Sequence, residues 1–240
     1  MSLVRYGKFF SPLLQRSLLA GRLAFKFSLL HKRVKLIFGV EDQRIVEYRW
    51  VLSMLKRFVH PNSRVLDVGC AESAFCNELM AMGYEVWGLD INEPLFANRK
   101  ILKFCKSDVR NVPLPENFFD AIVVISTIEH VGLPVYGQKT IEEDGDIRAM
   151  RELRRIIKSE GYLFLTTPFS GGDYRIIETE RQYNLERLKV LSNGFEIKAI
   201  NIYYPFKKGK RIFWREISLN SDEFVPAEKV GVACLMLQKV

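Results

Sequence analysis

The fold is decided by the stretch Val65-Leu66-Asp67-Val68-Gly69-Cys70-Ala71, an apolar run that stops at a glycine. A nearly continuous apolar run of this length is typical of a parallel strand that is buried on both faces. Gly69 permits the tight turn that such a strand needs at its end. Residues 72–82 then predict a helix that stops at Gly83. The stretch therefore predicts a strand, a tight loop and a helix, a plan that nucleotide-binding α/β proteins share.

The same alternation continues on both sides of this stretch. Strands are predicted at residues 64–69, 85–89, 102–106, 119–126, 161–166, 195–204 and 232–238. Helices are predicted at residues 42–58, 72–82, 94–99, 143–158 and 183–192. This order indicates an α/β protein with a Rossmann-like, mostly parallel seven-stranded sheet and helices on both faces. Ligands of such sheets bind at the carboxyl ends of the strands, so we expect the functional residues in the loops there.

The charge of the chain is concentrated at one end. The 240 residues carry a net charge of +8, and residues 1–40 contain eight Lys or Arg and no Asp or Glu. We therefore divide the chain into a basic helical arm or lid (1–41) and a nearly neutral catalytic domain (42–240). Arg16, Arg22 and Lys26 interrupt the apolar run from Leu13 to Leu30, which argues against a membrane span and a signal peptide. A membrane surface, RNA or the mouth of the active site remain open as partners of the arm.

The four cysteines bear on metals and on the compartment. Cys70, Cys76, Cys105 and Cys234 lack the close paired spacing of a zinc site, so we expect no structural metal. Scattered free cysteines fit the reducing cytosol. We expect a cytoplasmic protein, with peripheral contact to a membrane as an open alternative.

The position of Asp67, two residues before Gly69, bears on the class of ligand. A carboxylate there would repel the phosphates of a dinucleotide but suits a cationic ligand. Together with Gly69 it resembles the acid-Gly-x-Gly-x-Gly motif of the class I S-adenosylmethionine-dependent methyltransferases, specifically those with a methyltransferase type 11-like domain. The resemblance covers residues 45–200, and Ala71 and Ser73 replace the second and third glycines. It implies S-adenosylmethionine as the cofactor and a Rossmann-like methyltransferase fold.

The resemblance also assigns residues to the cofactor. Asp90 ends the second strand, 21 residues after Gly69, and is expected to bind both ribose hydroxyls; an ordinary loop aspartate is the alternative. Asp108 follows the third strand and is expected at the adenine amine, together with the backbone N–H of the next residue. The full expected cofactor set is Asp67, Gly69, Cys70, Ala71, Asp90, Ile91, Asp108, Val109 and Ser126.

The fourth strand ends in a loop that contains Glu129-His130-Val131. This run resembles one in several small-molecule and lipid methyltransferases. A histidine that titrates near neutral pH can act as a general base towards a hydroxyl acceptor. His130 is therefore the expected base and Glu129 its orienting partner or a cofactor contact, whereas a purely structural histidine is an equal alternative.

We expect a small-molecule, lipid-linked or saccharide acceptor. The alternatives are an RNA or protein methyltransferase anchored by the arm, with nucleic acid the less favoured partner, and a non-catalytic binding relic of the fold.

Two further segments carry expectations. Residues 166–172 have the composition of a mobile loop over the site. Residues 205–226 mix aromatic and basic side chains, which could stack on bases or sugars. A hairpin extension whose aromatics pack inward is the simpler interpretation, and we prefer it.

Overall fold

The computed structural model describes residues 43–97, 102–136, 141–209, 211–217 and 230–240. The predicted arm at residues 1–41, with its helices, lies outside the described residues. In chain order the elements are α2 (Gln43–Phe58), β1 (Arg64–Val68), α3 (Phe75–Ala81), β2 (Glu85–Asp90), β3 (Lys103–Lys106), β4 (Phe119–Ile125), the 3₁₀ helix η3 (Ile128–His130), α4 (Gly145–Ile156), β5 (Ile157–Ser170), β6 (Arg175–Ile177), β7 (Glu180–Gln182), α5 (Leu185–Leu191), β8 (Phe195–Lys208), β9 (Arg211–Ile217) and β10 (Val230–Lys239).

The main sheet has the strand order β3-β2-β1-β4-β5-β10-β8-β9. Strands β1 to β5 pair in parallel. β10 is antiparallel to both β5 and β8, and β9 is antiparallel to β8, so six of the eight strands run in one direction. The mostly parallel α/β sheet is confirmed, but it has eight strands rather than the seven predicted. The additional strand is β9, which completes a long hairpin with β8, as the preferred interpretation of residues 205–226 expected; Phe206, however, is exposed and does not pack inward.

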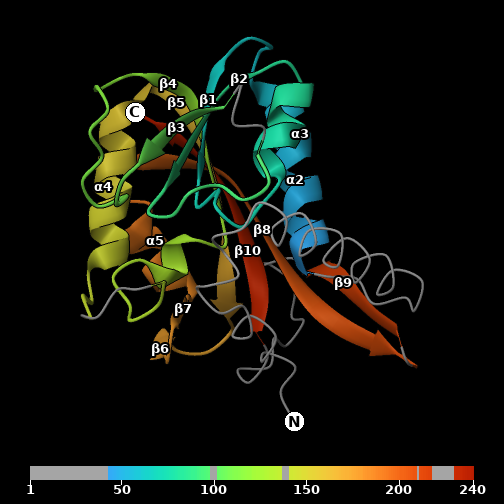
Figure 1. Ribbon diagram of the computed structural model, residues 1–240. Helices are drawn as coiled ribbons and strands as arrows, with labels where there is room; N and C mark the ends of the chain where they lie inside the picture. Colours follow the sequence, from blue (N-terminus) through green and yellow to red (C-terminus); the bar gives the residue numbers. More distant parts are fainter. Residues whose placement is uncertain (1–42, 98–101, 137–140, 210, 218–229) are drawn as a thin grey trace.

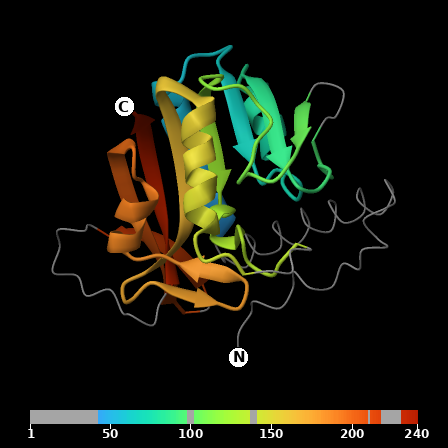
Figure 2. The ribbon, with the colours of Figure 1, turned by 90° about the vertical axis from the view of Figure 1, so that its left-hand side faces the viewer.

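Helices cover both faces of the sheet, with α2 and α3 on one side and α4 and α5 on the other (Figures 1 and 2). The buried side chains divide in the same way, because neighbouring residues of a strand point to opposite faces. Val65 of β1 packs with α2 and α3, whereas Leu66 packs with α4 and α5. In α2, Val51 and Leu55 are fully buried, and each stabilises the fold by about 1.5–3 kcal/mol.

Several boundaries differ from the prediction. No helix forms at residues 94–97, and residues 98 and 99 of that predicted helix lie outside the described residues. The predicted mobile loop at residues 166–172 is wrong for most of its length, because β5 continues to Ser170 as a buried strand paired with β10. A separate two-stranded sheet, β6 and β7, follows it and was not predicted. Within the described residues, no helix is long and apolar enough to span a bilayer.

Candidate active site

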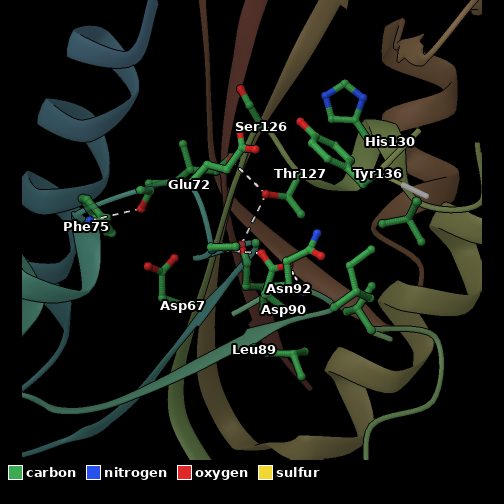
Figure 3. Close-up of a pocket in the computed structure, with 18 of the residues that line it drawn as sticks. Asp67, Glu72, Phe75, Leu89, Asp90, Asn92, Ser126, Thr127, His130 and Tyr136 are labelled. Atoms are coloured by element: carbon green, nitrogen blue, oxygen red, sulfur yellow. Dashed lines mark hydrogen bonds between the residues drawn. The ribbon is translucent and has the colours of Figure 1, made fainter. Parts of the chain in front are cut away.

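A cavity of about 360 Å³ opens at the edge where the parallel strands end. The loops after β1, β2, β3 and β4 line it, and the first turns of α2 close one side. Figure 3 shows side chains from these loops pointing towards one another across the cavity. Its position agrees with the expectation that ligands of a parallel sheet bind at the carboxyl ends of the strands.

The loop after β1 forms the floor of the cavity. Gly69 has φ +81°, and its N–H donates to the carbonyl of Leu89 at 2.9 Å. A Cβ at this position would overlap the hydroxyl of Thr127, so both the backbone conformation and the space require glycine. Ala71 also lines the cavity, whereas Cys70 of the same loop is fully buried, lies outside the lining and packs against Gly88.

Asp67 is almost completely buried in the cavity wall, with an exposed fraction of 3%. The thiol of Cys76 donates to its Oδ2 at 3.1 Å. Burial raises the pKa of Asp67 to about 7, although the Cys76 hydrogen bond and the charge of Arg44 oppose the rise. Burial thus disfavours the ionised form of Asp67. A positively charged ligand would bind favourably beside it, since a nearby cation stabilises the ionised form.

Asp90 is fixed at the end of β2 by the backbone of two loops. Its Oδ2 accepts from the N–H of Ala71 at 2.9 Å, and its Oδ1 accepts from the N–H of Asn92 at 2.8 Å. Burial raises the pKa of Asp90, and these backbone hydrogen bonds oppose the rise. Each carboxylate oxygen has more than one acceptor site. Asp90 can therefore accept from two neighbouring hydroxyls of a ribose, and Ile91 lines the cavity beside it.

Asp108 lies after β3 and lines the cavity with Val109. Its carboxylate is already engaged by Arg110, whose Nε lies 3.0 Å from Oδ1 and 3.1 Å from Oδ2 and whose backbone N–H donates to Oδ1 at 2.9 Å. Burial alone would raise the pKa of Asp108, but the bonds from Arg110 leave it below its ordinary value. The sequence did not predict this partner, which reduces the capacity of Asp108 for a ligand.

A buried carboxylate on α2 supports the wall formed by Ser126. Ser126, at φ +40°, donates through its hydroxyl to Oε1 of Glu47, and Thr166 donates to the same oxygen at 2.9 Å. Arg44 forms an ion pair with Glu47 at 3.5 Å and donates to the carbonyl of Ile125 at 3.1 Å. Sequence reasoning missed Arg44, which lines the cavity, and Glu47. The sequence signal that could have pointed to Glu47 is an acidic residue three positions before Trp50, which the structure buries.

His130 lines the cavity from η3. Its Nδ1 lies 2.6 Å from the carbonyl oxygen of Thr179, and its ring stands edge-on to Tyr136 with centroids 5.7 Å apart. Burial lowers the pKa of His130, and the bond to Thr179 opposes this. The ring is therefore neutral at pH 7.

Glu129 lies outside the cavity lining and is 2% exposed. Its Oε1 is 3.9 Å from Nε2 of His130, beyond hydrogen-bond distance, and its Oε2 has no hydrogen-bond partner among the described residues. Burial raises the pKa of Glu129 to about 8, so the carboxyl is largely protonated at pH 7. In the structure, therefore, Thr179 rather than Glu129 makes the contact that orients the ring of His130.

Comparison with known proteins gives a consistent result. Residues 66–165 match a family model described as a methyltransferase domain. An uncharacterized protein of Methanocaldococcus jannaschii is 29% identical over 135 residues, which are 55% of this chain and 52% of that protein. A sterol 24-C-methyltransferase of Gibberella zeae is 34% identical over 83 residues, 30% of this chain and 22% of the enzyme. The chain therefore spans about half of the first relative and about a fifth of the second.

The solved structure of a Burkholderia thailandensis enzyme gives the fold comparison. This 1,6-didemethyltoxoflavin-N1-methyltransferase, bound to 1,6-didemethyltoxoflavin and S-adenosylhomocysteine, has a TM-score of 0.58 and 15% identity. The match covers 96% of this chain and 91% of that chain. At this identity the likeness establishes the fold, which is the Rossmann-like methyltransferase fold that the sequence predicted.

Proposed function

We propose that this chain, which carries a class I S-adenosylmethionine-dependent methyltransferase domain, transfers the methyl group of S-adenosylmethionine to a hydroxyl of a small, lipid-linked or saccharide acceptor. One observation carries the proposal. Asp67, Asp90 and Asp108 lie at the ends of β1, β2 and β3, and all three line one cavity. Three acids in this arrangement suit a nucleoside with a positive charge, and none of them suits a phosphate.

The chain's own residues would hold the cofactor in distinct ways. Asp90 accepts from the ribose hydroxyls, because two backbone N–H groups already fix its carboxylate. Asp67 supplies negative charge beneath the loop that contains Gly69. When bound, S-adenosylmethionine supplies an activated methyl group on a sulfonium. Much of the catalysis can then consist of positioning and exclusion of water.

We assign the acceptor side of the cavity to His130 and Tyr136, both of which line it. A neutral imidazole can take the proton of a hydroxyl acceptor, which is a weak nucleophile unless it is deprotonated. A base at this position favours an acceptor that reacts through a hydroxyl oxygen over one that reacts through a neutral amine, since a neutral amine does not need to be deprotonated first.

Calorimetry with S-adenosylmethionine tests the cofactor half of the proposal. We expect binding by the wild-type protein and weaker binding by Asp90→Asn. No binding by protein that is shown to be folded would refute the proposal and favour a non-catalytic relic. For the acceptor half, His130→Ala should lower turnover much more than cofactor affinity, because the ring acts on the acceptor. Unchanged turnover would remove His130 as the base.

A membrane surface is the partner that we propose for the β8–β9 hairpin and the basic arm. Phe206 and Phe213 stack on one face of the hairpin with centroids 5.6 Å apart, and Arg215 lies 5.9 Å from the Phe206 ring. Lys208 and Arg211 are paired in register beyond them. Aromatic side chains flanked by cations suit an anionic lipid surface.

Co-sedimentation with vesicles tests the membrane proposal. Binding to phosphatidylglycerol vesicles that is absent with phosphatidylcholine alone would support it. Salt-dependent RNA binding without vesicle binding would support the RNA alternative instead.

A further inference from the structure

The ring of His130 is held through Nδ1, which lies 2.6 Å from the carbonyl oxygen of Thr179. A carbonyl oxygen can only accept a hydrogen bond, so Nδ1 must carry the proton of this contact. In a neutral imidazole one nitrogen carries a proton and the other has a lone pair. The contact with Thr179 therefore leaves the lone pair on Nε2.

Thr179 belongs to the turn between β6 and β7, the small hairpin that follows β5. The hairpin lies at the same end of the molecule as the loops that form the cavity (Figures 1 and 2). β7 also packs against η3, the element that contains His130. The position of the Thr179 carbonyl consequently depends on how the hairpin is attached to the loop after β4.

Arg181 of β7 makes that attachment. It is fully buried, and its Nη1 donates to the carbonyls of Val131 at 2.6 Å and Glu129 at 3.3 Å. Its Nη2 donates to the carbonyl of Glu142 at 2.7 Å. One guanidinium thus connects the hairpin with the backbone on both sides of His130 and with the segment that precedes α4.

The charge of Arg181 is balanced at the start of α4. Its Nε lies 3.8 Å from Oδ2 of Asp146, which is also fully buried. Asp146 further accepts from Arg187 at 2.9 Å and from the hydroxyl of Tyr183 at 3.1 Å. Removing one partner of a buried charged group is costly, so these contacts strongly stabilise the attachment of the hairpin. That attachment places the Thr179 carbonyl against the His130 ring.

We propose that the β6–β7 hairpin is a positioning device, in which the Thr179 carbonyl selects the Nδ1–H form of His130 and Arg181, a positioning residue, holds that carbonyl in place. The inference rests on the proposed function, since Nε2 matters as the atom that receives the acceptor proton. In that step the acceptor oxygen bonds to the methyl carbon, the carbon–sulfur bond breaks with its electron pair going to sulfur, and the acceptor proton passes to Nε2.

The charged groups around His130 fit this role. Glu180, next to Thr179 in the hairpin, stabilises the protonated ring, whereas Arg44 of α2 and Arg181 disfavour it. Glu129, the remaining acid near the ring, is largely protonated at pH 7. The ring is thus kept neutral before transfer, and its Nδ1–H bond persists when Nε2 becomes protonated.

Nitrogen NMR of the imidazole rings tests the proposal directly. The chain contains only three histidines, so a sample labelled with ¹⁵N-histidine gives few signals, and His130→Gln identifies that of His130. In wild-type protein without cofactor, at pH 8, we expect the Nδ1–H form of His130 to exceed the Nε2–H form by about tenfold. The net free energy of the hydrogen bond between Nδ1–H and the Thr179 carbonyl corresponds to a population ratio of this order. A predominant Nε2–H form in the wild-type protein would overturn the proposal without any variant having to fold.

Two matched substitutions test the part played by Arg181. Arg181→Lys keeps the charge but removes the forked donors, and we expect the tautomer ratio to fall by about tenfold, to near unity. Arg151→Lys makes the same change at an exposed position of α4, outside the hairpin, and should leave the ratio unchanged. A folded Arg181→Lys protein with the wild-type ratio would refute the role of Arg181. Calorimetry with S-adenosylmethionine on the same samples tests the proposed function separately, because the tautomer is measured without cofactor.

Discussion

Glu129 makes the unfolding free energy of the protein depend on pH in a way that one substitution can isolate. Its carboxyl is almost fully buried, and burial raises its pKa from an ordinary 4.5 to about 8. Between these two values the folded protein binds a proton that the unfolded chain releases. The stability from this group is therefore fully present below pH 4.5 and is lost as the pH rises towards 8.

The size of the effect follows from the two pKa values. Each pH unit between them corresponds to about 1.4 kcal/mol, so the full loss is on the order of 5 kcal/mol. This is a large part of the roughly 5–15 kcal/mol by which a domain is stable. Glu129→Gln keeps the size of the side chain but cannot ionise, so we expect it to unfold with much less loss of stability over the same range.

Urea unfolding at pH 5 and pH 8.5, without cofactor, measures the difference. We expect the wild-type protein to lose about 3–5 kcal/mol more than Glu129→Gln between these two conditions. Glu186→Gln, which changes an exposed acid on α5, is the control and should follow the wild-type protein. Parallel pH dependence in the wild-type protein and Glu129→Gln would show that the carboxyl ionises normally and would refute the reasoning.

Three further outcomes follow from the site. Asp90→Asn should weaken S-adenosylmethionine binding by about 10- to 100-fold in calorimetry, whereas Asp108→Asn, already engaged by a neighbouring guanidinium, should change it by less than about fivefold. Gly69→Ala should lower the free energy of unfolding by about 1–3 kcal/mol in urea, because it combines a strained φ with overlap against Thr127; an unchanged midpoint would contradict this. Cofactor affinity should rise between pH 5.5 and pH 7 as Asp67 ionises, and the rise should be absent in Asp67→Asn.

Much of the fold could be predicted because its signals are local. β1 and β4 are apolar runs that pack between two layers of helices, and such runs identify central parallel strands without knowledge of their partners. The acids at Asp67, Asp90 and Asp108 could be found for the same reason. Each follows a predicted strand directly, and the topology of a parallel sheet brings those positions to one edge.

The rest of the site depends on contacts that leave no local signal. Glu47 is buried because Ser126, which follows β4, and Thr166 of β5 meet it at the sheet edge. Arg181 binds backbone carbonyls, and His130 is oriented by the carbonyl of Thr179, a group that every residue possesses. The strands β6 and β7 are only three residues long, too short for a period to be recognised. Side-chain patterns therefore predicted the cavity lining after β1, β2 and β3 better than the contacts around His130.

The place of β10 in the sheet has a consequence for the protein during its synthesis. β10 separates β5 from β8, yet both of those strands leave the ribosome before it. Fifty-nine residues, 171–229, lie between Ser170 at the end of β5 and Val230 at the start of β10. At about 5–20 residues per second the delay is roughly 3–12 s. Throughout that interval β5 lacks its β10 partner, and β8 lacks it from its own synthesis onward; unpaired strand edges of this kind invite pairing with other chains. The nascent chain therefore carries unpaired strand edges until β10, the strand that joins β5 to β8, has been made.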